Sequence, residues 1–170
     1  MKLSQKRVRE IVGYTFEEEQ NSVESWFFRA ESFKEAAILL NQSDLSKVKF
    51  AYFYNAAISL ELLFKAALLQ RSGKVPNIHK LPVLAEELEL PISNEQSDTL
   101  ELLSEIIIWS GRYPVPSKGS FWDTYHDVIQ KKHIIREGNI TKPCPDRFPS
   151  LDNVSKIWKI CIEAMAQKSA

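Results

Sequence analysis

An arginine beside an aromatic residue is the first candidate for chemistry in this sequence. Arg112 is followed by Tyr113 and Pro114 and comes directly after a segment whose apolar residues have helical spacing. A guanidinium group presents a planar fork of donors that suits bidentate binding of a phosphate or a carboxylate, and a neighbouring ring can lie at a nucleotide edge. The alternative is structural: Arg112 would bind the last carbonyls of its helix or pair with an acidic residue, and Tyr113 would pack.

The three histidines are the next candidates. His79 could act as a general base or a ligand, or its ring could cap the loop before the next helix. His126 and His133 are seven residues apart, on one face of a continuous helix, with Asp123 one turn before His126. Zinc sites on one helix normally use ligands four residues apart, so we expect neither a metal site nor a cofactor.

A charged pair lies within the most apolar segment of the chain. Glu61 precedes Lys65 by four residues, which is the favourable order for an ion pair on a helix. A buried ion pair is costly unless it is well bonded, so we expect the pair to reach the surface, to join two helices, or to line a binding cleft.

Aromatic residues could stack nucleobases, but at helical spacing they also suit a core or a dimer interface. The candidates are Trp26, Phe27, Phe28, Tyr52, Phe53 and Tyr54. The chain has 22 basic and 22 acidic residues, so its net charge offers no overall basic field for a phosphate backbone. It also has no P-loop, Rossmann glycine motif, Cys-x-x-Cys or nucleophile elbow.

One long apolar segment, Lys47 to Arg71, must position these residues. It contains no glycine or proline and is apolar around most of its circumference, which is typical of a helix surrounded by others. The other expected helices cover residues 22–40, 81–88, 93–109, 121–135 and 150–165. No segment alternates at period two for long enough to form a sheet. We therefore predict a single all-α domain over 1–170, an up-and-down bundle of four to five main helices. Residues 1–21 would form a short helix or an N-terminal arm packed on this domain, and a helical insertion would lie near 117–149.

The cysteines and the N-terminus indicate the compartment. Cys144 and Cys161 are far apart in sequence, and we expect two reduced thiols, with one disulfide or a redox role as the alternatives. The charged N-terminus is followed by no apolar run of signal-peptide length, so we expect a cytoplasmic protein. The central segment is long enough for a membrane span, but its internal Glu and Lys favour burial in protein and no membrane partner.

The order of several of these features resembles the HEPN family, the higher eukaryote and prokaryote nucleotide-binding helical domains. Its members commonly have an apolar helix with Glu and Lys four apart, a Gly-Pro turn, a His-x-Leu entry to a short helix and a later Arg-Tyr-Pro. The matching residues here are Glu61, Lys65, Gly73, Pro76, His79, Leu81 and Arg112-Tyr113-Pro114. The resemblance covers residues 22–116 and the final helix. It implies a helical bundle, often a homodimer, in prokaryotic toxin-antitoxin, defence or RNA-processing systems.

Many members of that family are metal-independent ribonucleases with an Arg followed by a His after four to six residues. This chain departs from the pattern, because the first His after Arg112 is His126 and the first after Arg71 is His79. We therefore expect a binding module. Its ligand or partner would be a nucleotide, RNA, or a cognate nucleotidyltransferase or antitoxin protein. The binding residues would be Arg112, Tyr113, His79 and the Glu61–Lys65 face. The alternative is a divergent ribonuclease in which folding brings Arg112 close to His126 or His79. A purely structural bundle is a third hypothesis.

Overall fold

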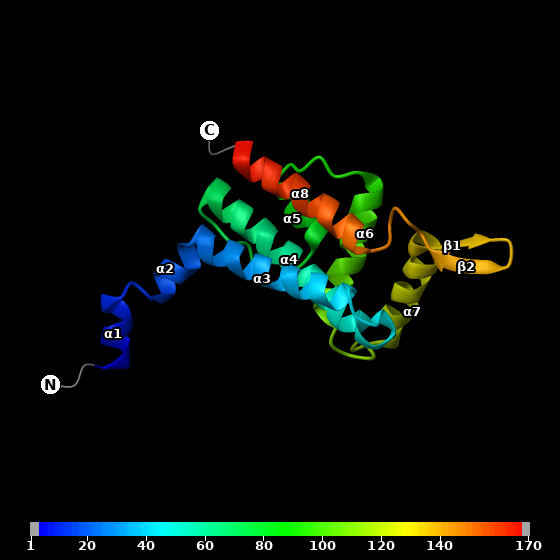
Figure 1. Ribbon diagram of the computed structural model, residues 1–170, viewed down its shortest axis with the longest axis horizontal. Coiled ribbons are helices and arrows are strands. Elements are labelled where there is room, and N and C mark those ends of the chain that lie inside the picture. Colours follow the sequence, from blue (N-terminus) through cyan, green and yellow to red (C-terminus); the bar gives the residue numbers. More distant parts are fainter. Residues whose placement is uncertain (1–3, 168–170) are drawn as a thin grey trace.

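The computed structural model describes residues 4–167, and 71% of it is helical. A helical bundle is therefore confirmed, and the sheet of the described residues is one two-stranded hairpin. Figure 1 shows the elements in chain order. They are α1 (Gln5–Ile11), α2 (Phe16–Asn21), α3 (Val23–Asn41), α4 (Leu45–Ser72), α5 (Leu81–Glu87), α6 (Asn94–Glu105), η1 (Ile106–Ser110), α7 (Gly119–Val128), η2 (Ile129–His133), β1 (Ile134–Glu137), β2 (Ile140–Pro143) and α8 (Leu151–Gln167), where η1 and η2 are π-helical turns.

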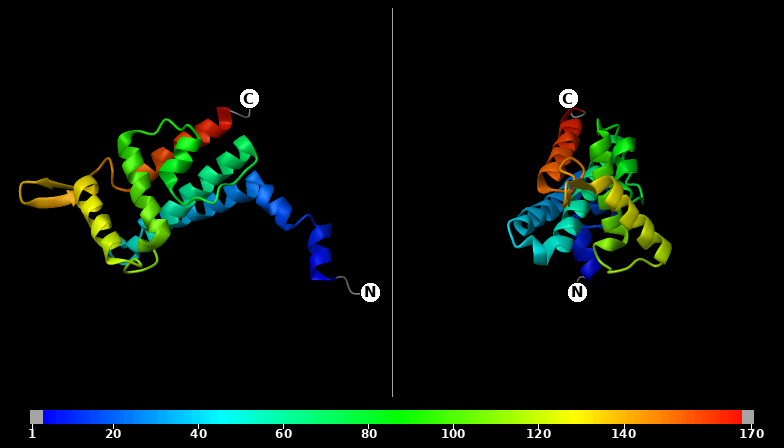
Figure 2. Two further views of the ribbon diagram at one scale, coloured as in Figure 1. Left: turned by 180° about the vertical axis from the view of Figure 1, so that it is seen from behind. Right: turned by 90° about the vertical axis from the view of Figure 1, so that its right-hand side faces the viewer.

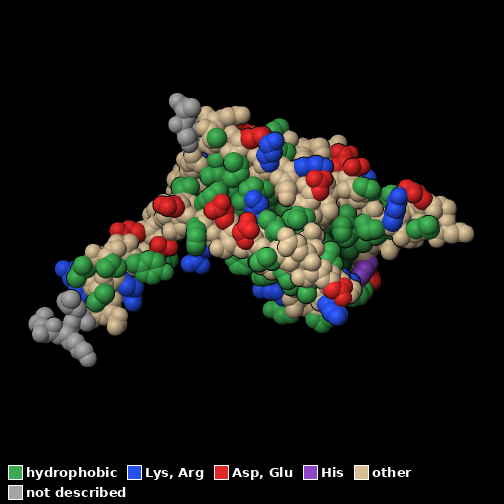
Figure 3. Space-filling view, in the orientation of Figure 1, with side chains coloured by type: hydrophobic (Ala, Val, Ile, Leu, Met, Phe, Trp, Pro, Cys, Tyr) green, Lys and Arg blue, Asp and Glu red, His purple; other side chains and the backbone are tan. Residues whose placement is uncertain are grey.

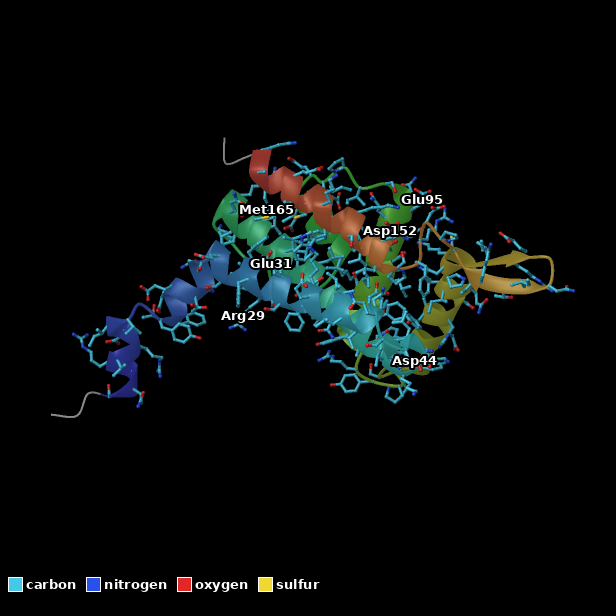
Figure 4. All side chains as sticks on the ribbon, in the orientation of Figure 1. Arg29, Glu31, Asp44, Glu95, Asp152 and Met165 are labelled. Atoms are coloured by element: carbon cyan, nitrogen blue, oxygen red, sulfur yellow. The ribbon has the colours of Figure 1, made fainter. Side chains whose placement is uncertain are left out.

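The helices α3 and α4 pack against each other as a hairpin, and local signals set their ends. The Ser22 hydroxyl accepts from the backbone N–H of Ser25 at the start of α3. Asp44, labelled in Figure 4, accepts from Ser46 N at the start of α4. Gly73 ends α4 in the left-handed conformation, with φ of 68°, where a side chain would be strained.

The helix α4 forms the centre of the core, as its composition predicts. Leu60, Leu63 and Phe64 are fully buried, and α3, α5, α6 and α8 all contact this helix. By length and hydropathy α4 resembles a membrane span, but 72% of its most apolar window is buried inside the protein. That burial is the pattern of a core helix.

Side-chain hydrogen bonds connect the surrounding helices to this core. The Ser104 hydroxyl of α6 accepts from Leu81 N at the start of α5, over 2.9 Å. The Tyr52 hydroxyl of α4 donates to the carbonyl of Pro149, directly before α8, over 3.1 Å. These bonds satisfy buried backbone groups at helix ends, so they place α5, α6 and α8 relative to α4.

The region 117–149 contains the predicted helix and also a β-hairpin that we did not predict. The helix starting near residue 121 ends as η2 at His133, and Ile134 begins a strand that pairs with β2 in an antiparallel hairpin. Gly138, with φ of 60°, allows the tight turn between the strands. Each strand has only four residues, too few for period-two alternation to be recognised.

The N-terminal segment forms short helices, which was one of the two predicted alternatives, and it is not the packed arm of the other. The helices α1 and α2 extend away from the bundle, at the opposite end from the β-hairpin (Figures 1 and 2). Neither of these two helices has a buried residue. The apolar side chains on α1 and α2 are therefore not part of the core of the bundle.

Candidate ligand-binding pocket

The backbone turn before Arg112 is the first structural feature of the candidate site. After α6 the helix widens into η1, and Gly111 N bonds the carbonyl of Ile106 at 3.0 Å. A Cβ on Gly111 would lie 2.8 Å from that carbonyl oxygen and 2.8 Å from Cδ2 of Tyr54. Only glycine fits, so the π-helical turn can press against α4 and direct the next residues outward.

Aromatic side chains from η1 and α7 face one another beside this turn. The rings of Trp109 and Tyr125 are 4.9 Å apart and nearly perpendicular, and Trp122 lies 6.2 Å from Trp109. His126 lies 4.3 Å from the ring of Trp122. Trp109 is held from the other side because its Nε1 donates to Glu105 Oε2 over 3.0 Å. These contacts give a ring-lined wall with a fixed geometry.

A pocket of about 470 Å³ lies against this wall. Its lining includes three of the residues singled out from the sequence, Arg112, Tyr113 and His126, together with Trp109 and Trp122. Folding thus brings Arg112 and His126 to one pocket although they are 14 residues apart in sequence. A pocket of this size with few polar groups suits a small planar ligand.

Arg112 lies at the exposed side of the pocket. Its guanidinium donates one hydrogen bond to the carbonyl of Ile108, over 3.0 Å, and its Cζ lies 5.3 Å from the centre of the Tyr113 ring. Among residues 4–167 it has no ion pair with a carboxylate. Arg112 therefore binds one carbonyl of its helix, as its structural alternative predicts. The other N–H donors of the guanidinium are available to an anion.

The hydroxyls of Ser110 and Tyr125 are neutral polar groups of the pocket lining. Burial raises the pKa of Tyr125, the neighbouring Ser110 hydroxyl acts in the opposite direction, and the charge of Glu105 raises it further. Tyr125 therefore stays protonated near neutral pH and can donate a hydrogen bond. The pocket offers rings, hydroxyls and one cation at its edge, a combination suited to a base with an attached phosphate.

The other candidate residues form a separate cluster. Glu61 Oε1 accepts from Lys65 Nζ over 2.7 Å and lies 3.0 Å from His79 Nδ1. The side chains of Glu61 and Lys65 are each only 7% exposed, whereas that of His79 is 54% exposed. A carboxylate only accepts, so Nδ1 of His79 carries the proton in this contact. The histidine thus connects the loop before α5 to α4, which matches its loop-capping alternative.

His133 is a buried side chain bonded to a loop carbonyl. Its ring is fully buried and its Nδ1 lies 2.9 Å from the carbonyl of Arg147. Burial lowers the pKa of His133, which favours the neutral ring. Within residues 4–167 no group of three or more His, Cys, Asp or Glu side chains is placed to hold a metal ion.

The aromatic residues named from the sequence divide between core and surface. Tyr52 is buried, Phe27 packs against Trp158 with ring centres 6.5 Å apart, and Phe28 is exposed. The pocket is built from other rings, Trp109, Trp122 and Tyr125. The sequence does contain one pattern that points to the α7 side of the pocket: Trp122, Tyr125 and His126 have the i, i+3, i+4 spacing of one helix face. That spacing alone does not distinguish a pocket wall from a core.

A model of the HEPN domain matches residues 23–137 of the chain. The chain belongs to the HEPN family. The HEPN match runs beyond residue 116, includes α7, η2 and β1, and ends before α8. No curated protein and no solved structure matched the chain.

Both candidate groups lie within the HEPN region. The pocket residues Arg112 and His126 and the cluster of Glu61, Lys65 and His79 all fall between residues 23 and 137. The β-hairpin is divided, because β1 lies inside the matched range and β2 outside it. The HEPN membership establishes the domain type, and the pocket geometry carries the argument about function.

Proposed function

We propose that this HEPN protein is a binding module for RNA or a nucleotide in a prokaryotic toxin-antitoxin, defence or RNA-related system. The pocket between η1 and α7 receives an unstacked base, and Arg112 contacts the adjoining phosphate. In this role the protein acts in the cytoplasm, without a metal or cofactor, and a cognate nucleotidyltransferase or antitoxin protein is a second kind of partner for the same surface.

One observation carries this proposal. An arginine with no carboxylate partner among the described residues stands at the edge of a pocket walled by Trp109, Trp122 and Tyr125. An aromatic ring can stack on any of the nucleobases, so stacking does not depend on the RNA sequence, and a guanidinium can bind a phosphate through two hydrogen bonds. A purely structural bundle gives no reason for a guanidinium without a carboxylate partner to lie beside an aromatic pocket.

The first test measures binding of single-stranded RNA by fluorescence anisotropy at several salt concentrations. Arg112→Ala should weaken binding and reduce the slope of log K against log salt by about 0.7, the value for one phosphate of a single strand. Arg136→Ala is the matched control, because Arg136 is also exposed and also bonds a backbone carbonyl, but on the β-hairpin. Equal effects of the two variants would refute a specific role for Arg112.

The second test separates stacking from charge. Trp122→Ala should weaken binding by about 1–3 kcal/mol, roughly 5- to 150-fold, and leave the salt slope unchanged. Phe121→Ala is the control, since Phe121 is the adjacent exposed ring and lines a neighbouring hollow instead of this pocket. A Phe121 variant that binds as poorly as the Trp122 variant would contradict the assigned pocket.

A metal-independent ribonuclease is the second candidate, and the shared pocket of Arg112 and His126 is the observation that favours it. His126 would take the proton of a ribose 2′-hydroxyl, and the 2′-oxygen would attack the adjoining phosphorus. The bond from phosphorus to the 5′-oxygen would break, the leaving 5′-oxygen would take a proton from water, and Arg112 would stabilise the charge on the phosphate. Purified protein should then cut RNA in EDTA, and the activity should be lost in Arg112→Ala and His126→Ala but retained in His79→Ala. RNA left intact by the pure protein would exclude this candidate and leave the binding module.

A further inference from the structure

One ring nitrogen of His133 is buried without a protein partner. The side chain is 0% exposed, and its Nδ1 lies 2.9 Å from the carbonyl oxygen of Arg147. A carbonyl only accepts, so Nδ1 carries the proton, and in the neutral ring Nε2 is then an acceptor. Among residues 4–167 no group donates a hydrogen bond to Nε2. Buried polar atoms are normally bonded, so this nitrogen is available to a ligand.

The charged groups around His133 do not supply the missing donor. Burial lowers the pKa of His133, so its ring is neutral near pH 7. Lys132 of η2 donates to Asp98 and Glu101 of α6, over 2.8 and 2.6 Å. These three charges therefore satisfy one another beside the ring and leave Nε2 as an open acceptor.

A cavity of about 450 Å³ lies against this ring, and we call it the His133 cavity. It is formed between the first turns of α4 and the segment of α7 and η2, and Leu102 and Ile106 are buried parts of its wall. Its exposed rim includes Lys49 and Phe50 of α4. Figure 3 shows green apolar side chains on the surface at this end of the bundle, with charged side chains around them. A half-open apolar cavity of this size suits a small molecule.

The His133 cavity is distinct from the pocket at Arg112, although the two are neighbours. Both are lined by Gly111 and Tyr125, but Arg112, Trp122 and His126 line only the pocket. A ligand in the His133 cavity can therefore be separated from one in the Arg112 pocket by substitutions on either side.

The polar groups of the cavity restrict the class of ligand. The buried Ser110 hydroxyl also lacks a bonded partner, but it can rotate toward the neighbouring Tyr125 hydroxyl, whereas the His133 ring is fixed by its bond to the loop. A charged ligand would lose its hydration without gaining a buried counter-charge, because Lys49 lies at the exposed rim. A nucleobase has several donors and acceptors, and most of them would stay unpaired against apolar walls. An apolar ring with a single donor leaves the fewest polar atoms unpaired.

We propose that the His133 cavity binds a small neutral aromatic molecule that carries a single N–H or O–H donor. The donor bonds Nε2 of His133, and the ring packs against Leu102 and Ile106. Indole is the simplest probe of this class. Benzofuran is its matched control, because it has the same two-ring shape with an oxygen in place of the N–H group.

The first experiment compares the two probes on the unmodified full chain by isothermal titration calorimetry. Indole should bind at one site about 3- to 10-fold more tightly than benzofuran, the range expected for one hydrogen bond. The ¹⁵N resonance of His133 Nε2 should move when indole is added and move much less with benzofuran, since only indole donates. Equal affinities with an unmoved resonance would overturn the proposal, and so would the failure of either probe to bind up to its solubility limit.

The second experiment locates the site. His133→Asn keeps a donor for the Arg147 carbonyl but removes Nε2, so this variant should bind indole only as weakly as benzofuran. His126→Asn is the matched control, because it makes the same change at the histidine of the Arg112 pocket. It should bind both probes as wild type does, and so should Trp122→Ala.

Loss of indole binding in His126→Asn or Trp122→Ala would place indole in the Arg112 pocket and overturn the proposal. Circular dichroism checks that His133→Asn is folded, and if it is not, the comparison of indole with benzofuran on wild type still decides. RNA binding enters none of these outcomes, so the proposal stands or falls separately from the function proposed for the Arg112 pocket.

Discussion

Replacing Lys65 by methionine tests the energetic role of the buried pair in α4. The change removes the ammonium that lies 2.7 Å from Glu61 Oε1 and leaves a carboxylate whose side chain is 7% exposed. The remaining neighbour, His79, is 54% exposed and compensates only in part. Breaking a buried ion pair by removing one partner typically costs about 3–5 kcal/mol, and we expect Lys65→Met to fall in this range.

The double variant gives the decisive comparison. Glu61→Leu with Lys65→Met removes both charges and fills the same space with apolar groups, so its free energy of unfolding should lie within about 2 kcal/mol of wild type. The double variant should therefore be more stable than either single variant. His79 loses its acceptor, but as an exposed ring it can bind water instead.

Urea denaturation followed by circular dichroism measures these differences, with the slope m checked for two-state behaviour. The matched control is the exposed pair Lys159 and Glu163 on α8, with an N–O distance of 3.7 Å and side chains 76% and 57% exposed. Its coupling energy should be no more than about 0.5 kcal/mol. A coupling energy between Glu61 and Lys65 as small as that of the surface pair would refute the reasoning.

Three further predictions follow from single positions. Gly111→Ala should cost about 1–3 kcal/mol, because its Cβ would meet the Ile106 carbonyl, whereas Gly119→Ala in open space should be neutral or stabilising, and thermal unfolding compares the two. Burial lowers the pKa of His133 below 6.5, so the unfolded chain binds more protons and stability should fall as pH drops below 6.5. His133→Asn, which keeps a donor for the loop carbonyl, should reduce this dependence in urea titrations. Burial also raises the pKa of Cys161 to about 12, so a thiol reagent at pH 8 should modify it only when the protein unfolds.

Local sequence determined the central hairpin because its signals act over a few residues. Both helices begin or end at residues that bond to backbone groups within one turn, namely Ser22, Asp44 and Gly73. The apolar residues of α4 lie around most of its circumference, so they are removed from water only when other helices surround α4. The family resemblance rested on Glu61 and Lys65 of α4 and on short motifs after it, up to Arg112-Tyr113-Pro114, and the HEPN match confirms the family. All of this could be predicted without coordinates.

Tertiary structure decided the position of every candidate functional residue relative to the others. Arg112 and His126 share a pocket only because Gly111 lets η1 approach α4 and α7 folds back over it. Glu61 and Lys65 are buried, and the loop before α5 brings His79 against Glu61, which their spacing in the sequence does not reveal. The short hairpin is local, but its four-residue strands are too short for alternation to reveal them. The projecting arm depends on contacts with the bundle that it does not make, and a periodicity measured along one helix carries no information about which surface will lie against it.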